Sequence, residues 1–379
     1  MSFPMTIIKK TCHIHRKENK IMMKKTISLI IASVICLSLV SCGCSSGGGD
    51  ADVHVFYYTY SDPYISSVRS ELDRRLDDAG VAYQDHDSNN SQTTQTEQVQ
   101  TAITRGAKLL LVNIVTTGSD DAATGIVELA REKGIPVVFF NREVSDSVVN
   151  SYDKCLFIGT DAAEAGYLQG DMIGDYLTEN FNKVDLNGDG EISYVMFMGE
   201  KGNNEAIYRT RYSVENADAK LEAAGFPPLR FYDASNSDKY LLDRDGKWSA
   251  QAANEYMTTI LTSYNVASGN MVELVICNND NMAEGAITAL NAAGYNTGEE
   301  GSVTVPVFGV DATEAAKSLI GSGKMTGTVK QDAAGMAEAL TLVTAAGIAD
   351  RELTSPLEGY TIDEDSAKVR INYSAYFGE

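Results

Sequence analysis

Histidine and cysteine are scarce in this sequence, and their scarcity limits the chemistry that it can perform. Four of the 379 residues are His and six are Cys. Only His54 and His86 follow the first 50 residues, so neither a His-based triad nor a His-rich metal site is expected. The sequence also lacks the phosphate-binding glycine motifs, the H-E-x-x-H motif and the G-x-S-x-G motif. No class of enzyme is therefore indicated by a local motif.

Basic residues and prolines are also few. Lys and Arg number 31 against 52 Asp and Glu, which gives a net charge of −21 at pH 7. A surface this acidic repels phosphate backbones, so we expect no nucleic-acid partner. Seven prolines and 32 glycines argue against collagen and low-complexity disorder. The length exceeds what one ordinary hydrophobic core can organise and favours two domains.

The start of the chain differs in composition from the rest. Two lysines precede an apolar run at residues 27–40, which is typical of a secretory signal and short for a membrane span. The run ends in LVSC, which resembles the lipobox of bacterial lipoproteins, and that resemblance implies acylation of Cys42. We therefore predict a leader over residues 1–41 and a flexible, Gly/Ser-rich tether over residues 42–51. The alternative is a plain cleaved signal in which Cys42 and Cys44 are incidental.

Two further cysteines, Cys155 and Cys277, each lie in an apolar, strand-like run. We expect both to be buried free thiols, because cysteine behaves as a small apolar residue in such surroundings. A disulfide between them is the alternative, since the spacing in the sequence cannot decide between the two.

Short apolar runs alternate with longer amphipathic segments from residue 53 onward. This alternation predicts parallel sheets covered by helices on both faces. It restarts at residue 155, so the expected fold class is α/β, with two doubly wound parallel-sheet domains. The predicted strands are 53–60, 81–87, 109–115, 136–140, 155–159, 192–199, 229–233, 273–278 and 305–310, and the predicted helices are 65–79, 94–105, 121–133, 162–180, 205–224, 249–264 and 282–293.

Polar side chains follow the carboxyl ends of four predicted strands. They are Asp62, Asn141, Asn279 with its neighbour Asp280, and Asp311. Ligands of open α/β sheets lie outside these strand ends, so the side chains would face one shared cleft. The alternative for each residue alone is that it caps the following helix. Their occurrence at four corresponding strand ends favours the shared site.

A loop suited to a cation is the sharpest local motif in the chain. Residues 185–193, DLNGDGEIS, resemble the first three-quarters of an EF-hand loop, with oxygen ligands at positions 1, 3 and 5 and Gly at position 6. Position 12 is Met196 instead of a bidentate Glu, so the missing acid must come from elsewhere in the chain. The alternative is a turn that binds no metal. The calcium ligands expected from the loop are Asp185, Asn187 and Asp189 by side chain, Glu191 by its carbonyl, and Ser193 by side chain or through water.

Six segments carry a family resemblance. They are VVFFNRE at 137–143, SYDKCLFIGTD at 151–161, QGDMI at 169–173, DLNGDGEI at 185–192, ELVICNNDNMAEGA at 273–286 and VPVFGVDA at 305–312. In this order they resemble the bacterial galactose/glucose-binding proteins of ABC import systems, and the likeness spans about residues 53–373. The resemblance implies a type I periplasmic binding protein-like fold with a three-crossing hinge. It also implies that Glu273 supplies the calcium ligand that the loop lacks.

The resemblance implies a set of sugar-binding residues as well. Tyr64 and Trp248 stand where the family has aromatic walls, which cover the C–H faces of a sugar ring. Planar amides, carboxylates and guanidinium groups can each engage two hydroxyls. Asn203 and Glu205 replace the family's His and Asp, and Gln331 replaces an Asn, so we expect a reshaped pocket. The implied sugar-binding residues are Asp62, Tyr64, Asn141, Asn203, Glu205, Arg209, Trp248, Asn279, Asp311 and Gln331.

By the same resemblance the protein is expected to bind a monosaccharide, galactose or glucose above all, and to deliver it to a membrane permease. It would do so without covalent chemistry, as a lipid-anchored monomer on the outer face of the cell membrane or in the periplasm. Two alternatives stay open: a secreted sugar-active hydrolase using carboxylates such as Asp62 and Asp311, and a sugar-sensing receptor module of the same fold. The expected lobes are residues 52–159 with 332–368, and residues 160–331 with 369–379.

Overall fold

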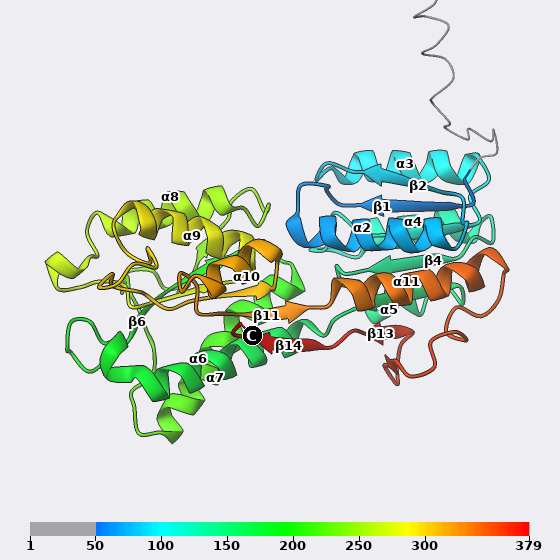
Figure 1. Ribbon diagram of the computed structural model, residues 1–379. Coiled ribbons are helices and arrows are strands. Elements are labelled where there is room, and N and C mark those ends of the chain that lie inside the picture. The colour runs from blue at the N-terminus through cyan, green and yellow to red at the C-terminus, as the bar shows by residue number, and fades with distance from the viewer. Residues whose placement is uncertain (1–50, 379) are drawn as a thin grey trace, which may run out of the picture. The chain divides into compact units, whose positions relative to one another are not determined.

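The computed structural model of the protein describes residues 51–378. The predicted leader, the predicted lipidation site Cys42 and all but the last residue of the predicted tether lie outside this range. Within it, no helix combines the length and the apolar character that crossing a membrane requires. Two β-sheets organise the described part of the chain (Figure 1).

The first sheet has seven strands in the order β12-β13-β5-β4-β3-β1-β2. All neighbours pair in parallel except β12, which is antiparallel to β13. We call this sheet and its helices the first lobe. Its strands are β1 (Val53–Tyr57), β2 (Tyr83–Asp87), β3 (Leu109–Val112), β4 (Val137–Phe140), β5 (Cys155–Gly159), β12 (Thr361–Ile362) and β13 (Lys368–Arg370), and its helices are α2 (Pro63–Asp78), α3 (Gln92–Thr104), α4 (Asp121–Arg131), α5 (Asp146–Val149) and α11 (Ala333–Ile348).

The second sheet has the order β14-β11-β10-β9-β6-β7, and the short β8 also pairs with β6. Its neighbours are parallel except β14, which is antiparallel to β11. We call this sheet and its helices the second lobe. Its strands are β6 (Ser193–Met198), β7 (Arg230–Phe231), β8 (Leu241–Leu242), β9 (Leu274–Cys277), β10 (Val307–Asp311), β11 (Gly327–Gln331) and β14 (Tyr373–Tyr376), and its helices are α6 (Ala162–Val184), α7 (Asn204–Ala223), α8 (Ala250–Leu261), η1 (Val266–Ser268), α9 (Asp280–Ala292) and α10 (Glu314–Gly321).

The interior strands β3 and β4 are apolar along their whole length, because helices cover both faces of the sheet. Strand β3 reads LLLV, and all four residues are buried. Leu109 and Leu111 pack into a hydrophobic cluster with α2 and α11. Leu110 and Val112 point to the opposite face and pack with α3 and α4. The alternation of side chains along a strand thus builds two cores on one sheet.

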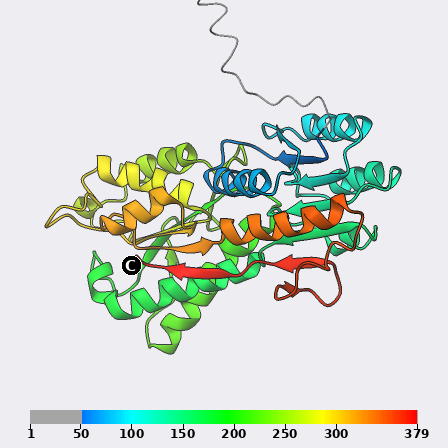
Figure 2. The same cartoon turned by 45° about the vertical axis from the view of Figure 1, so that its right-hand side comes forward.

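The chain passes between the lobes three times. Helix α11 lies beside α2 in both views (Figures 1 and 2), so the segment after β11 returns to the first lobe. Strand β14 then ends the chain in the second sheet. The crossings lie between Gly159 and Ala162, between Gln331 and Ala333, and between Arg370 and Tyr373.

The last crossing lies two residues beyond the boundary predicted at residue 368. Strand β13 still pairs with β5 through Val369 and Arg370. The guanidinium of Arg370 donates to Glu143 at 2.9 Å and to Asp363 at 2.6 Å, and both acceptors belong to the first lobe. These charge-assisted hydrogen bonds hold the strand in the first sheet beyond the predicted boundary.

The predicted α/β fold class with two parallel sheets is confirmed. The predicted strand 229–233 shrinks to the two residues of β7, since Asp233 instead accepts a hydrogen bond from the Ser235 N–H at 2.9 Å and starts a turn. Cys155 and Cys277 are buried free thiols as expected, and the alternative of a disulfide between them is wrong.

Candidate functional site

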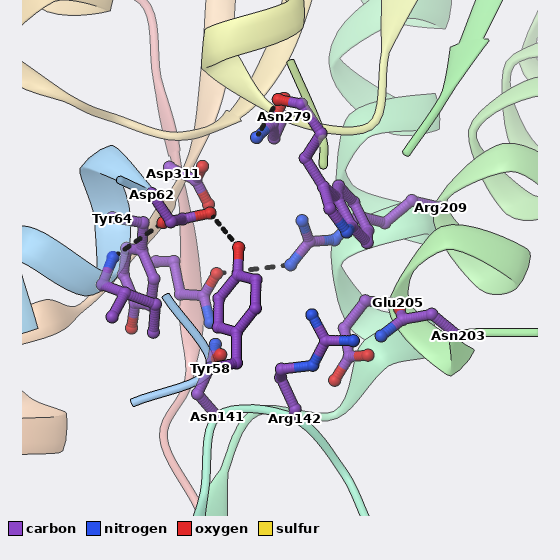
Figure 3. Close-up of a pocket in the computed structure, with 13 residues that line it drawn as sticks. Tyr58, Asp62, Tyr64, Asn141, Arg142, Asn203, Glu205, Arg209, Asn279 and Asp311 are labelled. Carbon is purple, nitrogen blue, oxygen red and sulfur yellow. Dashed lines mark hydrogen bonds between the residues drawn. The ribbon is translucent and has the colours of Figure 1, made fainter. Parts of the chain in front are cut away.

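One pocket lies where the carboxyl ends of strands from both sheets meet (Figure 3). It is lined by all ten residues that the sequence predicts as sugar ligands, together with Tyr58, Ile65 and Arg142. Tyr58, Asp62, Tyr64, Ile65, Asn141 and Arg142 come from the first lobe, and Asn203, Glu205, Arg209, Trp248, Asn279, Asp311 and Gln331 come from the second lobe.

Three of these polar residues also cap helices. The Ile65 N–H donates to Asp62 Oδ1 at 2.8 Å, the Ala206 N–H to Asn203 and the Met282 N–H to Asn279, each at 3.0 Å. These residues therefore cap helices, as the alternative interpretation held, and they also line the pocket. Capping fixes each side chain on its helix, so the same bond that stabilises the helix orients the polar group in the pocket wall.

Three other lining residues adopt φ angles in the left-handed region. Asn141 has φ 61°, Trp248 has φ 54° and Asp311 has φ 128°. Such a backbone costs on the order of 1–3 kcal/mol at a residue other than glycine, and it persists where the surrounding structure holds it in place. Asn141 follows β4, Asp311 ends β10 and Trp248 precedes α8, and in each case the side chain lines the pocket.

Arg209 is the electrostatic centre of the second-lobe wall. It is 4% exposed, and its guanidinium donates to Asn278 O at 2.9 Å, to Tyr373 Oη at 2.8 Å and to Gln331 Oε1 at 3.3 Å. Burial disfavours its charge, but Tyr373, Asp311 and the neighbouring Glu205 outweigh burial and raise the pKa of Arg209. The pocket thus contains a permanent cation.

Two buried carboxyl groups face this cation. Burial raises the pKa of Asp311 well above its ordinary value, and Arg209 opposes that shift. Burial likewise raises the pKa of Glu205, again against the attraction of Arg209. The carboxyl groups and the guanidinium depend on one another, because each would be costly to bury alone.

Four buried polar atoms in the pocket wall have no hydrogen-bond partner in the described chain. They are Arg142 Nε, Arg209 Nε, Gln331 Nε2 and Glu205 Oε2. Buried polar groups in native proteins are almost always hydrogen-bonded, so each of these atoms needs a partner from outside the chain. Figure 3 shows the guanidinium groups of Arg142 and Arg209 pointing towards the same space. The arrangement suits a small, uncharged ligand with several neighbouring hydroxyls.

The indole of Trp248 forms an apolar part of the wall. A Cβ on Gly199 would lie 2.2 Å from the indole, so only glycine leaves room for the ring there. The indole Nε1 donates to Glu200 Oε2 at 3.3 Å, and the Trp248 carbonyl accepts from the side-chain amides of Asn279 and Asn281. Trp248 precedes α8 by two residues, yet these contacts direct it into the pocket instead of only against its helix.

Sequence reasoning missed Tyr58, Ile65 and Arg142. Arg142 directly follows Asn141, so its place after a strand end was a usable signal. Tyr58 directly follows β1, and its hydroxyl donates to Asp62 Oδ2 at 2.6 Å. An aromatic residue at the end of a buried strand reads as core, which is why Tyr58 carried no signal.

The predicted calcium loop lies on the second lobe and is closed by Glu273. This residue is fully buried, and its carboxylate accepts from the Leu186 N–H at 2.8 Å and from the Ser193 N–H at 2.9 Å. Burial raises the pKa of Glu273, and these hydrogen bonds oppose the shift. The Asp185 carboxylate accepts from the N–H groups of Gly188 and Gly190. Within residues 51–378 no three His, Cys, Asp or Glu side chains converge as a metal cluster.

Comparison with known proteins places the chain in a family. Residues 53–351 match the family described as periplasmic binding protein domain. The chain belongs to the periplasmic binding protein family. Among curated relatives of this periplasmic binding protein, the D-galactose/methyl-galactoside binding periplasmic protein MglB of Haemophilus influenzae is 33% identical over 320 residues, which are 84% of this chain and 87% of the relative. A putative rhizopine-binding protein of Rhizobium meliloti is 30% identical and covers 83% of this chain and 87% of its own length.

Solved structures show the same fold. An ABC transporter solute binding protein of Clostridium phytofermentans with bound β-D-glucose aligns with a TM-score of 0.66 at 21% identity, over 86% of this chain and 93% of the other. One of Bacillus halodurans with bound myo-inositol has a TM-score of 0.63 at 24% identity, over 87% and 96%. The two-lobed architecture of this periplasmic binding protein is thus shared with solved relatives, and the predicted family resemblance is confirmed.

Proposed function

We propose that the protein is the extracytoplasmic solute-binding component of an ABC sugar importer. It binds one monosaccharide, galactose or glucose above all, between its lobes and delivers it as a monomer to a membrane permease. The observation that carries this proposal is the set of four unpartnered buried polar atoms in a pocket built from both lobes. The relative named for galactose and methyl-galactoside binding supports a hexose, and family membership supports a place outside the cytoplasm.

The walls of the pocket match the surface of a pyranose. Tyr64 and Trp248 are only 5% and 6% exposed and offer aromatic faces to the C–H groups of a ring. Amide, carboxylate and guanidinium groups around them can each bond two neighbouring hydroxyls. The ten residues that the resemblance implies as sugar ligands, Gln331 and Glu205 included, keep that proposed role.

Calorimetric titration of the mature protein tests this function. The panel is D-galactose, D-glucose, D-xylose, D-ribose and myo-inositol. A saturable heat of binding is expected with at least one hexose. The absence of binding heat with every hexose would overturn the proposed sugar-binding function. Scattering profiles with and without the best ligand test closure of the lobes, because a ligand bonded by both lobes favours the closed state. Superimposable profiles would contradict closure.

The rival function is a sugar-active hydrolase with Asp62 and Asp311 as acid and base. Both oxygens of Asp62 already accept hydrogen bonds, from the Ile65 N–H and the Tyr58 hydroxyl. Such a group is poorly placed to exchange protons with a leaving group. We therefore propose binding without covalent chemistry. Release of nitrophenol from nitrophenyl galactosides or glucosides by the purified protein would favour the hydrolase instead.

We also propose that the loop at residues 185–193 holds a structural Ca²⁺. The donors Asp185, Asn187, Asp189, Ser193 and the carbonyl of Glu191 are hard oxygens at the offsets that calcium prefers. In support, Glu273 is fully buried against this loop although it lies 80 residues beyond Ser193. When bound, the ion would neutralise these carboxylates and tie the loop to the start of β9.

Replacing Glu273 by Ala is expected to lower the melting temperature by about 5 °C, because four hydrogen bonds to a buried carboxylate are lost with the proposed metal ligand. The variant should also lose the drop in melting temperature that a chelator causes in the wild-type protein. Differential scanning fluorimetry with and without EGTA measures both effects.

The matched control is Glu191→Ala. The side chain of Glu191 is half exposed and pairs with Arg230, and only its backbone carbonyl is a proposed ligand. This variant should keep the response to EGTA. A wild-type protein indifferent to EGTA, or a Glu273 variant that still responds to it, would contradict the calcium site.

We propose lastly that the chain is anchored by a lipid at Cys42. Cys42→Ser is expected to move the protein from the detergent phase to the aqueous phase of a Triton X-114 extraction, because the acyl chains are lost. Cys44→Ser is the matched control and should stay in the detergent phase. Equal partitioning of the two variants would contradict acylation at Cys42 and favour the plain cleaved signal.

A further inference from the structure

One ion pair joins the two lobes beside the pocket. Arg142 follows β4 of the first lobe, and Glu200 follows β6 of the second lobe. Arg142 Nη2 lies 2.6 Å from Glu200 Oε2, and the two side chains are 6% and 20% exposed. Within residues 51–378, no other ion pair bridges the lobes across the pocket. Pairs this short and this shielded from water are stronger than ordinary surface pairs.

Three contacts hold the guanidinium of Arg142, and its Nε has no hydrogen-bond partner in the described chain. Its guanidinium carbon lies 4.4 Å from the centre of the Tyr58 ring, and Nη2 also donates to Val115 O at 3.0 Å. Both contacts come from its own lobe, and Glu200 supplies the third from the other lobe. A further donor, Nε, is buried in the pocket wall without a hydrogen-bond partner among residues 51–378. A ligand oxygen in the pocket is the natural acceptor for it.

Glu200 also contacts Trp248, a pocket residue of its own lobe. Its Oε2 accepts from the indole Nε1 of Trp248 at 3.3 Å as well as from Arg142. One carboxylate oxygen therefore binds a pocket residue from each lobe. Because the Trp248 carbonyl is in turn bonded by Asn279, a continuous line of contacts runs from Tyr58 through this oxygen to α9.

We infer that the ion pair of Arg142 and Glu200 is a latch that slows release of the bound ligand. Arg142 Nε donates a hydrogen bond to the ligand, and Glu200 holds both Arg142 and Trp248 in position. Arg142 is thus a ligand-binding residue, and Glu200 is a positioning residue that acts through its two partners. This inference rests on the proposed sugar-binding function. The latch can form only when the lobes are closed, so it stabilises the closed complex more than the encounter between open protein and ligand.

The dissociation rate constant koff reports stabilisation of the closed complex, and the association rate constant kon reports the encounter between open protein and ligand. Trp248 is the only tryptophan in the chain and lines the pocket, so its fluorescence reports binding in a stopped-flow instrument. Glu200→Gln removes the charge and keeps the shape. We expect koff for the best hexose to rise about tenfold or more and kon to change less than about threefold, because losing one partner of a buried charge pair acts mainly on dissociation.

Glu215→Gln is the matched control. Glu215 also pairs with an arginine, Arg211, at 2.8 Å, but both side chains are more than half exposed and lie on α7 away from the pocket. This variant should leave kon and koff unchanged. Arg142→Lys keeps the positive charge but cannot hold Glu200 and the ligand through one planar fork, so it should weaken binding at least as much as Glu200→Gln.

The outcomes are distinct. If Glu200→Gln lowers the melting temperature and leaves koff at the wild-type value, Glu200 is only structural and the latch is overturned. Should Glu200→Gln fail to fold, Arg142→Lys with wild-type koff would overturn it equally. Failure of the underlying function would show as a wild-type protein that binds no hexose, before any variant is compared.

Discussion

Arg209→Met is expected to abolish measurable sugar binding. The guanidinium of Arg209 compensates the buried carboxyl groups of Glu205 and Asp311, and it donates to Gln331 and Tyr373. Removing one partner of such a buried network costs about 4 kcal/mol, which corresponds to about three orders of magnitude in Kd. Calorimetric titration with the best hexose measures the loss directly.

The control lies two residues along the same helix. Arg211 is more than half exposed and pairs with Glu215 on the surface, so Arg211→Met should bind sugar with wild-type affinity. Circular dichroism of both variants checks that each is folded. An Arg209 variant that is folded and binds within about tenfold of the wild type would contradict the central place given to this residue.

Gly285→Ala is expected to cost about 3 kcal/mol in the free energy of unfolding. A Cβ at Gly285 would lie 2.0 Å from the carbonyl oxygen of Ala250, where α9 crosses the start of α8. The obstacle is backbone, which no change of rotamer can relieve, so the two helices must move apart and disturb the cluster that they share. Chemical denaturation gives the effect as a lower midpoint with an unchanged slope.

Gly125→Ala is the matched control, and it is expected to raise the free energy of unfolding instead of lowering it. Gly125 also lies inside a helix, α4, but nothing would lie within 4 Å of its added Cβ. The substitution should stabilise the protein by about 0.5–1 kcal/mol, because alanine is the better helix former and the unfolded chain loses freedom. Similar denaturation midpoints for the two variants would contradict the close packing of α8 on α9.

The alternation of strands and helices was readable from the sequence because parallel sheets demand it. Runs such as LLLV and VVFF are buried on both faces, so their strands could be placed to within a few residues. The grouping of Asp62, Asn141, Asn279 and Asp311 was readable for the same reason, since strand carboxyl ends meet at one edge of a sheet. Their chemical roles towards a ligand stay predictions.

Contacts between the lobes were not readable. Nothing local to Arg142 or Glu200 says that a residue after β4 will meet one after β6, because that distance depends on how three chain crossings place two sheets. The packing of the Trp248 indole against Gly199 likewise joins residues that lie far apart in the sequence. The last crossing was placed two residues early because the family resemblance supplied its position, whereas in this chain the hydrogen bonds of Arg370 to Glu143 and Asp363 hold β13 in the first sheet through Arg370.

The late return of the chain to the first lobe also sets an order of folding during synthesis. The core on one face of the first sheet needs α11, and the sheet is extended by β13, so the lobe lacks essential parts until residue 370 has been made. Domains usually fold as they leave the ribosome, N-terminal part first. The first lobe therefore stays incomplete until every strand of the second lobe except β14 has been made. Such a delay suits export, because a chain that has not finished folding can still pass through a narrow secretion channel.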